Sequence, residues 1–299
     1  VHDISVYTGW DADSLREAFA EENNLFYILT NSRGFTEEQT KAAHLEIADA
    51  VDRAAKEASR DYIFISRSDS TLRGHYPLET RLLKECYERN TGVKLDGEVL
   101  CPFFKEGGRY TIGNVHYVKY GDELVPAHET EFAKDKTFGY TAENLPDYVE
   151  EKTAGEYKAK DVISISLEDI RSMDFDKIES QLMSAKNFNK IIVNAIDYSD
   201  IKVFAVALFR AMNVGKMFMF RTAAALVKVM GGVSDMPLLT RSDMIVNETE
   251  NGGIIVVGSH TAKTTSQLEC LKEIADIEFI ELDANLVSDE ESFANEVDR

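Results

Sequence analysis

The residues best suited to chemistry in this chain lie in one polar loop, residues 66–75, which reads Ser-Arg-Ser-Asp-Ser-Thr-Leu-Arg-Gly-His. The loop directly follows an apolar run at residues 62–65, which is typical of a buried strand. In open α/β sheets, ligands bind beyond the carboxyl ends of the strands, where Arg, Ser, Thr and Gly can hold a carboxylate or a phosphate. The loop therefore predicts an anion-binding site. A surface turn that caps a helix is the alternative.

Composition limits both the class of protein and the class of partner. With 299 residues, of which 44% are hydrophobic and 29% charged, the chain is globular and long enough for two domains. Its formal net charge of -20 argues against nucleic acid or anionic membrane as the main partner, because both bind basic surfaces. An anionic small molecule is compatible where basic residues gather, which singles out Arg67, Arg73, Lys105 and Arg109.

The cysteines favour a reducing compartment. Cys86, Cys101 and Cys270 are widely spaced and odd in number, which indicates neither a disulfide framework nor a cysteine-based metal site. No apolar run approaches the ~18 residues of a membrane-spanning helix, and the first residues lack a signal-peptide pattern. These observations predict a cytoplasmic protein.

Short apolar runs alternate with helical patterns along most of the chain, which predicts an α/β fold with a mostly parallel sheet and flanking helices. Strands are expected at residues 25–30, 62–66, 98–101, 162–167, 191–195 and 217–220. A capping box at residues 36–39 predicts the start of one helix, and Pro77 can start another. Further helices are expected at residues 168–186 and 199–212.

One segment breaks this alternation. Residues 103–140 are rich in glycine and aromatic residues and have no helical period. The run at residues 115–120, followed by Gly121, predicts a hairpin inserted into the fold. An irregular connection of this length is more typical of a functional segment than of a passive linker.

A second α/β domain is predicted to begin after a boundary at residues 231–253. The apolar run at residues 254–257 predicts a strand, and Gly258 and Ser259 would then turn into a helix. Such a turn can hold a phosphate, because free amides and the helix dipole point at it. An ordinary strand-to-helix connection is the alternative. The chain contains neither the P-loop pattern nor the glycine pattern of dinucleotide-binding folds.

Six motifs, in order along the chain, resemble those of the four-carbon acid sugar kinases. They lie at residues 68–74, 101–111, 115–118, 129–135, 220–224 and 257–260. The resemblance implies a sugar-acid-binding domain at residues 1–240 and the start of a nucleotide-binding domain at residues 247–299. It also implies an Asp-rich turn ahead of Val1 and a glycine-rich ATP-binding segment beyond Arg299. Without these parts, the chain is expected to fold in its N-terminal part and not to turn over substrate.

The same resemblance implies an ATP-dependent kinase that phosphorylates the terminal hydroxyl of a four-carbon or related oxo sugar acid, with ATP and Mg²⁺ as cofactors. The residues expected to bind the sugar acid are Arg67, Ser70, Thr71, Arg73, Gly74 and Arg109. Those expected to bind the nucleotide are Gly258, Ser259 and His260. Asp69 is the best candidate for a catalytic base among the residues present, and a cap or an organiser of the ligand site is its alternative role. Ion pairs with structural or surface carboxylates are the alternatives for Arg73 and Arg109.

A protein of another class is also compatible with the sequence. The main alternative to the kinase is a non-catalytic sugar-acid-binding or regulatory protein, and ATP binding separates the two. A nicotinamide-dependent oxidoreductase is a third interpretation, and it needs a dinucleotide pattern that the chain lacks. The expected partners are the sugar acid and ATP, without nucleic acid, membrane or a protein-held metal, and a homo-oligomer is compatible with the sequence.

Overall fold

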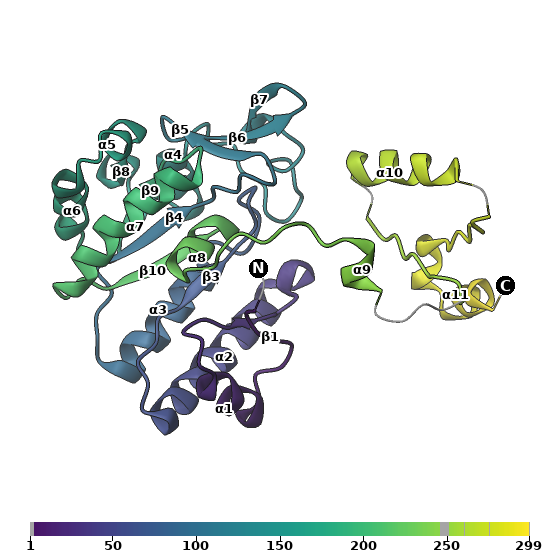
Figure 1. Cartoon of the computed structure of the whole chain (residues 1–299), viewed down its shortest axis with the longest axis horizontal. Helices are drawn as coiled ribbons and strands as arrows, with labels where there is room; N and C mark the ends of the chain where they lie inside the picture. Colours follow the sequence, from purple (N-terminus) through teal and green to yellow (C-terminus); the bar gives the residue numbers. More distant parts are fainter. Residues whose placement is uncertain (1–2, 246–250, 260, 275, 299) are drawn as a thin grey trace. The chain divides into compact units, whose positions relative to one another are not determined.

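The computed structural model describes residues 3–245, 251–259, 261–274 and 276–298 (Figure 1). Its contacts divide the chain into two compact units, Val1–Pro237 and Leu238–Arg299. The first unit contains three sheets and most of the helices.

A five-stranded parallel sheet forms the centre of the first unit, in the order β3, β10, β4, β9 and β8. These strands span Ile65–Arg67, Phe218–Thr222, Gly97–Cys101, Asn189–Val193 and Ile163–Ile165. The carboxyl ends of β3, β10 and β4 meet at one edge, because Arg67 pairs with Thr222 and Thr222 pairs with Cys101. The predicted α/β fold with a mostly parallel sheet is confirmed.

Helices cover both faces of this sheet (Figure 1). One face packs against α5 (Leu167–Arg171), α6 (Phe175–Ser184), α7 (Tyr198–Asn213) and α8 (Ala224–Met230). The other face packs against α3 (Leu78–Thr91) and α4 (Leu145–Lys152), while α2 (Glu37–Ala58) lies along α3 and α1 (Ala12–Ala20) along α2.

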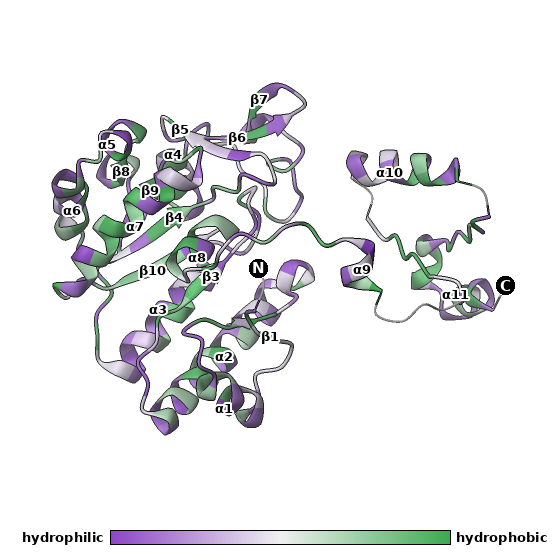
Figure 2. Ribbon diagram, viewed as in Figure 1, coloured by the Kyte–Doolittle hydropathy of each residue, from purple (hydrophilic) through white to green (hydrophobic). Residues whose placement is uncertain are grey.

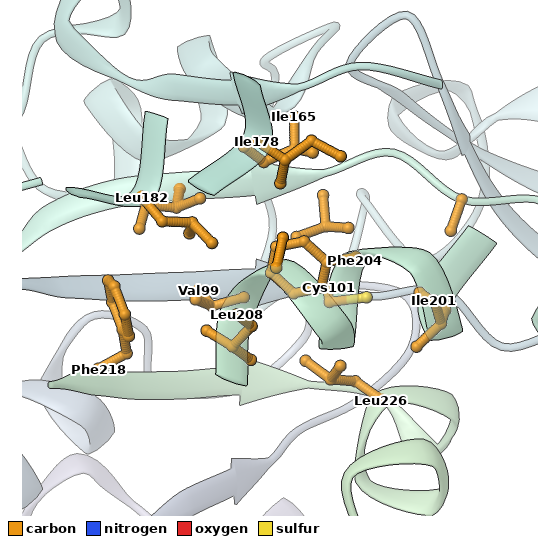
Figure 3. Close-up of a cluster of buried hydrophobic side chains, with 14 of the residues drawn as sticks. Val99, Cys101, Ile165, Ile178, Leu182, Ile201, Phe204, Leu208, Phe218 and Leu226 are labelled. Atoms are coloured by element: carbon orange, nitrogen blue, oxygen red, sulfur yellow. The ribbon is translucent and has the colours of Figure 1, made fainter. Parts of the chain in front are cut away.

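The largest apolar core lies between the sheet and the helices α5 to α8 (Figure 3). Successive residues of a strand point to opposite faces, so Val99, Ile191 and Phe218 of neighbouring strands point to the same side. There they pack against Leu182 of α6 and Leu208 of α7. Each of these side chains is fully or almost fully buried.

Local signals set the ends of several helices. The predicted capping box of α2 is present: the Thr36 hydroxyl accepts from the Gln39 amide, and the Gln39 side chain accepts from the Thr36 amide. Hydrophobic and hydrophilic residues alternate around this helix (Figure 2). The single helix predicted at residues 168–186 is wrong: Met173 has a φ of 53°, and the Asp174 side chain caps a new helix at the Lys177 amide.

The inserted segment forms a three-stranded antiparallel meander, one strand more than the predicted hairpin. Its strands are β5 (Arg109–Ile112), β6 (Val115–Tyr120) and β7 (Glu123–Pro126), and a 3₁₀ turn, η2 (Ala127–Glu129), follows. The meander is joined to the end of β9 because Thr111 and Ala195 exchange two backbone hydrogen bonds of 3.0 Å. A further 3₁₀ turn, η3 (Ala159–Asp161), precedes β8.

The strand predicted at residues 25–30 is short and lies outside the central sheet. It is β2 (Tyr27–Ile28), which pairs in parallel with β1 (Val6–Tyr7). After β2, the chain makes a 3₁₀ turn, η1 (Ser32–Gly34), before α2 begins.

The described part of the second unit consists of α9 (Arg241–Met244), α10 (Ala262–Lys272), the 3₁₀ turn η4 (Ala284–Ser288) and α11 (Glu290–Val297). The strand predicted at residues 254–257 is not formed, and Ile254 and Val256 are 91% and 89% exposed. A strand needs a neighbour for its backbone groups, and the described residues of this unit supply none. Across the described ranges, no helix has the length and apolar character needed to cross a membrane.

Candidate functional site

The predicted anion-binding loop leaves the carboxyl end of β3 and stays close to the edge of the sheet. The Ser68 amide donates to the carbonyl oxygen of Thr222, at the end of β10, over 2.7 Å. Two positive φ angles, at Leu72 (70°) and Gly74 (128°), turn the loop toward α3. A side chain at Gly74 would also meet the Glu79 carboxylate at 3.1 Å, so glycine suits this position for two reasons.

Asp69 is the centre of the hydrogen bonds in this loop. One carboxylate oxygen accepts from the Thr71 amide at 3.1 Å, from the Thr71 hydroxyl, and from Arg73 Nε at 3.0 Å. The other accepts from Arg73 Nη2 and from Arg33 Nη2, both at 3.1 Å. Burial disfavours the charged carboxylate, but the hydrogen bonds and the positive charges outweigh it and lower the pKa of Asp69.

Arg73 therefore pairs with a carboxylate of its own loop, which was the alternative to ligand binding. Two of its nitrogens bind Asp69, and its guanidinium carbon lies 4.9 Å from the centroid of the Phe132 ring. Nη1 has no hydrogen-bond partner among the described residues. Arg73 is thus held in place by Asp69 and Phe132 and keeps donors for a ligand.

Arg109, at the start of β5, lies near the same Phe132 ring as Arg73. Its guanidinium carbon is 5.4 Å from the Phe132 ring centroid, and Nη1 donates to the carbonyl oxygen of Gly107. Nε is buried without a partner, and within the described ranges no carboxylate lies within ion-pair distance of Arg109. Burial lowers the pKa of Arg109, against the opposing effect of nearby acidic groups. Arg109 is thus a partly buried cation with no described carboxylate within ion-pair distance.

His116 of the meander connects β6 to the loop. Burial lowers the pKa of His116 to about 4, so its ring is neutral at pH 7. Nε2 lies 2.8 Å from the carbonyl oxygen of Ser70 and Nδ1 lies 3.0 Å from the Thr111 hydroxyl. Since only a donor can pair with a carbonyl, Nε2 carries the proton and Nδ1 accepts from Thr111.

Arg221, which lies on β10, holds the loop through hydrogen bonds. Its side chain is buried and donates to the Ser68 hydroxyl at 3.0 Å, to Glu79 at 2.7 Å and to the carbonyl oxygen of Arg73 at 3.4 Å. Its guanidinium carbon also lies 4.8 Å from the Tyr76 ring centroid. The sequence offered one signal for this role, a charged residue inside the apolar run of β10.

The structure thus brings together most of the residues predicted to bind the sugar acid. Thr71 and Arg73 both bind Asp69, Gly74 lies against Glu79, and the Ser70 carbonyl faces His116. Arg67 differs from these residues in the direction of its side chain. It pairs with Thr222 in register, so its side chain projects from the face of the sheet that also bears Ile65 and Phe220.

An open pocket extends from this loop to the connection between β2 and α2. Its lining includes residues 66–70 and Arg73 of the loop and Thr30, Ser32 and Arg33 of the β2–α2 connection. Phe132, His116 and Arg221 lie within the six motifs, whereas Arg33 and Glu79 lie outside them. The specific contacts of all five residues join distant parts of the chain, so residue spacing alone does not predict them.

The predicted nucleotide-binding residues belong to the second unit. Gly258 and Ser259 are exposed, and the Ser259 hydroxyl accepts from the Thr264 hydroxyl at 2.9 Å near the start of α10. His260 lies outside the described residues. Since the strand at residues 254–257 is not formed, the described residues of this unit do not build a strand-turn-helix phosphate site. No group of three potential metal ligands occurs in the described ranges.

The chain matches a known protein family. A family model described as the sugar-binding N-terminal domain matches residues 2–230, which include the whole loop, the meander and Arg221. The chain belongs to this family. The resemblance to the four-carbon acid sugar kinases is confirmed at the level of the family, and the first unit is a sugar-binding domain.

Solved structures share the fold of this sugar-binding chain. Two crystal forms of a domain of unknown function (DUF1537) from Bordetella bronchiseptica match with TM-scores of 0.52 and 0.53 at 17% and 18% identity. The matches cover 99% of this chain but only 63% and 64% of theirs, so this chain spans less than two thirds of those proteins. Both are described as domain-swapped dimers with bound citrate.

A Haemophilus influenzae protein of the same DUF1537 family matches with a TM-score of 0.49 at 15% identity. That match covers 98% of this chain and 70% of the other. No curated protein sequence matches the chain significantly.

Proposed function

We propose that this sugar-binding domain holds the substrate of an ATP-dependent kinase, which phosphorylates the terminal hydroxyl of a four-carbon or related oxo sugar acid. Membership of the family establishes sugar binding. The acid, the transfer of a phosphoryl group, and the use of ATP and Mg²⁺ are the proposed part.

The proposal that the ligand is an acid rests on the surroundings of Arg109. This guanidinium is partly buried, has no carboxylate partner in the described ranges, and shares the Phe132 ring with Arg73. A buried cation is usually paired, because desolvation without a counter-charge is costly. A ligand carboxylate would supply the missing partner, and guanidinium groups bind it through two parallel hydrogen bonds.

The contacts of Asp69 favour the role of organiser over that of base. A base needs a free lone pair and a pKa near the working pH, but Asp69 already accepts from five donors and its pKa is lowered. In this proposal Asp69 orients Arg73 and Thr71, and the proton of the substrate hydroxyl goes to another group. His116 and Arg221 hold the loop that carries these residues.

The transfer step needs a nucleotide, which would supply the phosphoryl group with Mg²⁺ bound to its phosphates. Gly258, Ser259 and His260 stay the proposed contacts. The described residues around them do not form a phosphate site. The citrate bound by the Bordetella domain is a hydroxy acid, which supports a substrate of this chemical class. The domain-swapped dimers there support a homo-oligomer, which sedimentation would test.

Calorimetric titration with threonate, erythronate and citrate tests the acid site. Arg109→Ala and Arg73→Ala are each expected to weaken binding by about 10-fold or more, since a hydrogen bond to a charged group contributes about 1.5–3 kcal/mol. Arg89→Ala is the matched control, because Arg89 is a half-exposed arginine that pairs with Asp49 on α2, away from the loop. Unchanged affinity in both variants would contradict the site. ADP release that depends on a sugar acid, measured in a coupled assay, separates the kinase from a non-catalytic binding protein.

A further inference from the structure

Arg33 reaches the candidate site from a part of the chain that the motifs do not include. It lies in η1, directly after β2, and its Nη2 donates to Asp69 over 3.1 Å. The same connection is fixed a second time, because His75 Nε2 lies 2.8 Å from the carbonyl oxygen of Phe35. Thr30, Ser32 and Arg33 line the same pocket as the Asp69 loop.

Of the hydrogen bonds that Asp69 accepts, the one from Arg33 is the easiest to replace by a hydrogen bond from Arg33 to a ligand. Thr71 and Arg73 hold Asp69 from within its own loop through four donors, and Asp69 is 13% exposed. Arg33 contributes a single donor and its side chain is 72% exposed. A carboxylate has about four lone-pair positions, so the fifth donor adds least. Exposed ion pairs of this kind contribute little to stability.

The charges around Arg33 also favour a role in binding an anion. Within the loop Asp69 already neutralises Arg73, so Arg33 adds a positive charge beyond what this carboxylate needs. The chain as a whole carries a net charge of -20, which repels anions over most of its surface. An exposed guanidinium at the pocket wall is therefore suited to attract an anion and to bind it with its remaining N–H groups.

We propose that Arg33 is a ligand-binding residue, which leaves Asp69 to bind a carboxylate of the incoming acid and so helps the site to select acids over neutral sugars. Arg33 then contacts the ligand from the β2–α2 connection, while Arg73 contacts it from the Asp69 loop. This inference rests on the proposed function, because it assumes that the ligand of the loop is an acid.

Titration of the chain with citrate and with threonate tests the proposal. Arg33→Ala is expected to weaken binding at least 10-fold, and Arg33→Lys to recover only part of the loss, since an ammonium group cannot bind a carboxylate through two parallel hydrogen bonds. Arg16→Ala is the matched control: Arg16 is 60% exposed and pairs with Asp13 at 2.6 Å on α1. It removes the same charge from a similar ion pair, and its affinity should stay within 2-fold of the unaltered chain.

Three results would overturn the proposal. If Arg33→Ala binds both acids within 2-fold of the unaltered chain while Arg73→Ala does not bind, the inference fails and the proposed function stands. If Arg33→Ala has no further effect in an Asp69→Asn background, Arg33 acts only through Asp69 and does not contact the ligand. A chain that binds none of the acids would contradict the proposed function itself, and the inference with it.

Discussion

Alternate residues of the same strands build the two faces of the central sheet, and one of these faces buries charged side chains besides apolar ones. On the face under α7, Val99 and Phe220 are fully buried and belong to the largest apolar core. On the opposite face, the same two strands and β9 bury Glu98, Lys190 and Arg221. Parallel strands covered on both faces are usually apolar throughout, so the second face is the unusual one.

The buried charges of the polar face form ion pairs. Glu98 and Lys190 are neighbours in register on β4 and β9, and their charged groups lie 2.5 Å apart. The Lys190 ammonium also lies 3.8 Å from the Phe188 ring centroid and 4.1 Å from that of Tyr157. Burial lowers the pKa of Lys190, and the Glu98 carboxylate opposes this effect. The Tyr76 hydroxyl donates to Glu98 at 3.2 Å.

This pairing extends from the sheet to the loop of Asp69 and Arg73. Tyr76, which follows the loop, binds Glu98 through its hydroxyl and lies under the guanidinium of Arg221. Arg221 in turn binds Ser68 and Glu79 at the two ends of the loop region. The apolar face stabilises the fold through hydrophobic burial, which does not depend on direction. The polar face forms directional hydrogen bonds and ion pairs, which orient the loop.

The largest effect is expected from breaking the buried pair. Lys190→Met leaves the Glu98 carboxylate without a counter-charge, which should lower the free energy of unfolding by about 3–5 kcal/mol. The double variant Glu98→Gln with Lys190→Met removes both charges and keeps an acceptor for Tyr76, so it should recover most of this loss. Urea denaturation measures both variants. A single variant that loses under 1 kcal/mol would show that the pair is not held as described.

A smaller effect on stability, and a larger one on binding, is expected at Arg221. Arg221→Met removes charge-assisted hydrogen bonds to Glu79 and Ser68, which should cost about 1.5–3 kcal/mol and release the loop. Leu208→Ala on the apolar face is the control, with an expected loss of about 2–5 kcal/mol. Calorimetry should show weaker sugar-acid binding in Arg221→Met and unchanged binding in the folded Leu208→Ala variant. Equal affinities would remove the distinction between the faces.

The smallest effect near neutral pH is expected at His116, where the loop meets the meander. The pKa of His116 is about 4 in the folded chain, against about 6.5 in the unfolded chain, so below pH 6.5 the unfolded chain binds a proton that the folded chain does not. Stability is therefore complete above pH 6.5 and falls as the pH drops toward 4, by up to about 1.4 kcal/mol per pH unit. His116→Gln lacks this contribution. Urea denaturation of both chains from pH 8 to 4 should give the shallower slope for the variant, and parallel curves would contradict the assignment.

Local signals in the sequence were enough for much of the fold and for the position of the site. The capping box of α2 and the start of α3 after Pro77 depend on neighbours within one helical turn, and both are present in the structure. The α/β alternation follows from hydrophobic periodicity, which each segment carries by itself. The loop of Asp69 and Arg73 was found in the same way, because a polar loop after a buried run places ligand-binding residues at a sheet edge.

Two elements show where local signals end. The apolar run at residues 254–257 has the composition of a strand, but no neighbouring strand pairs with it in the described part of the second unit. The helix expected at residues 168–186 divides at Met173, because the Asp174 side chain competes for the backbone amides of the next turn. Strand pairing is non-local, and helix breaks depend on competing hydrogen bonds that the hydrophobic period does not report.

By itself, the sequence determined the fold class, the loop at the end of β3 and the presence there of Asp69 and Arg73. Only the tertiary structure decided what these residues do to one another. Arg33 lies 36 positions from Asp69, and Glu98 lies 92 positions from Lys190, so both contacts arise from chain packing and strand register. The lowered pKa of Asp69 and the burial of Arg109 Nε without a hydrogen-bond partner follow from neighbours in space, which the order of residues along the chain does not specify.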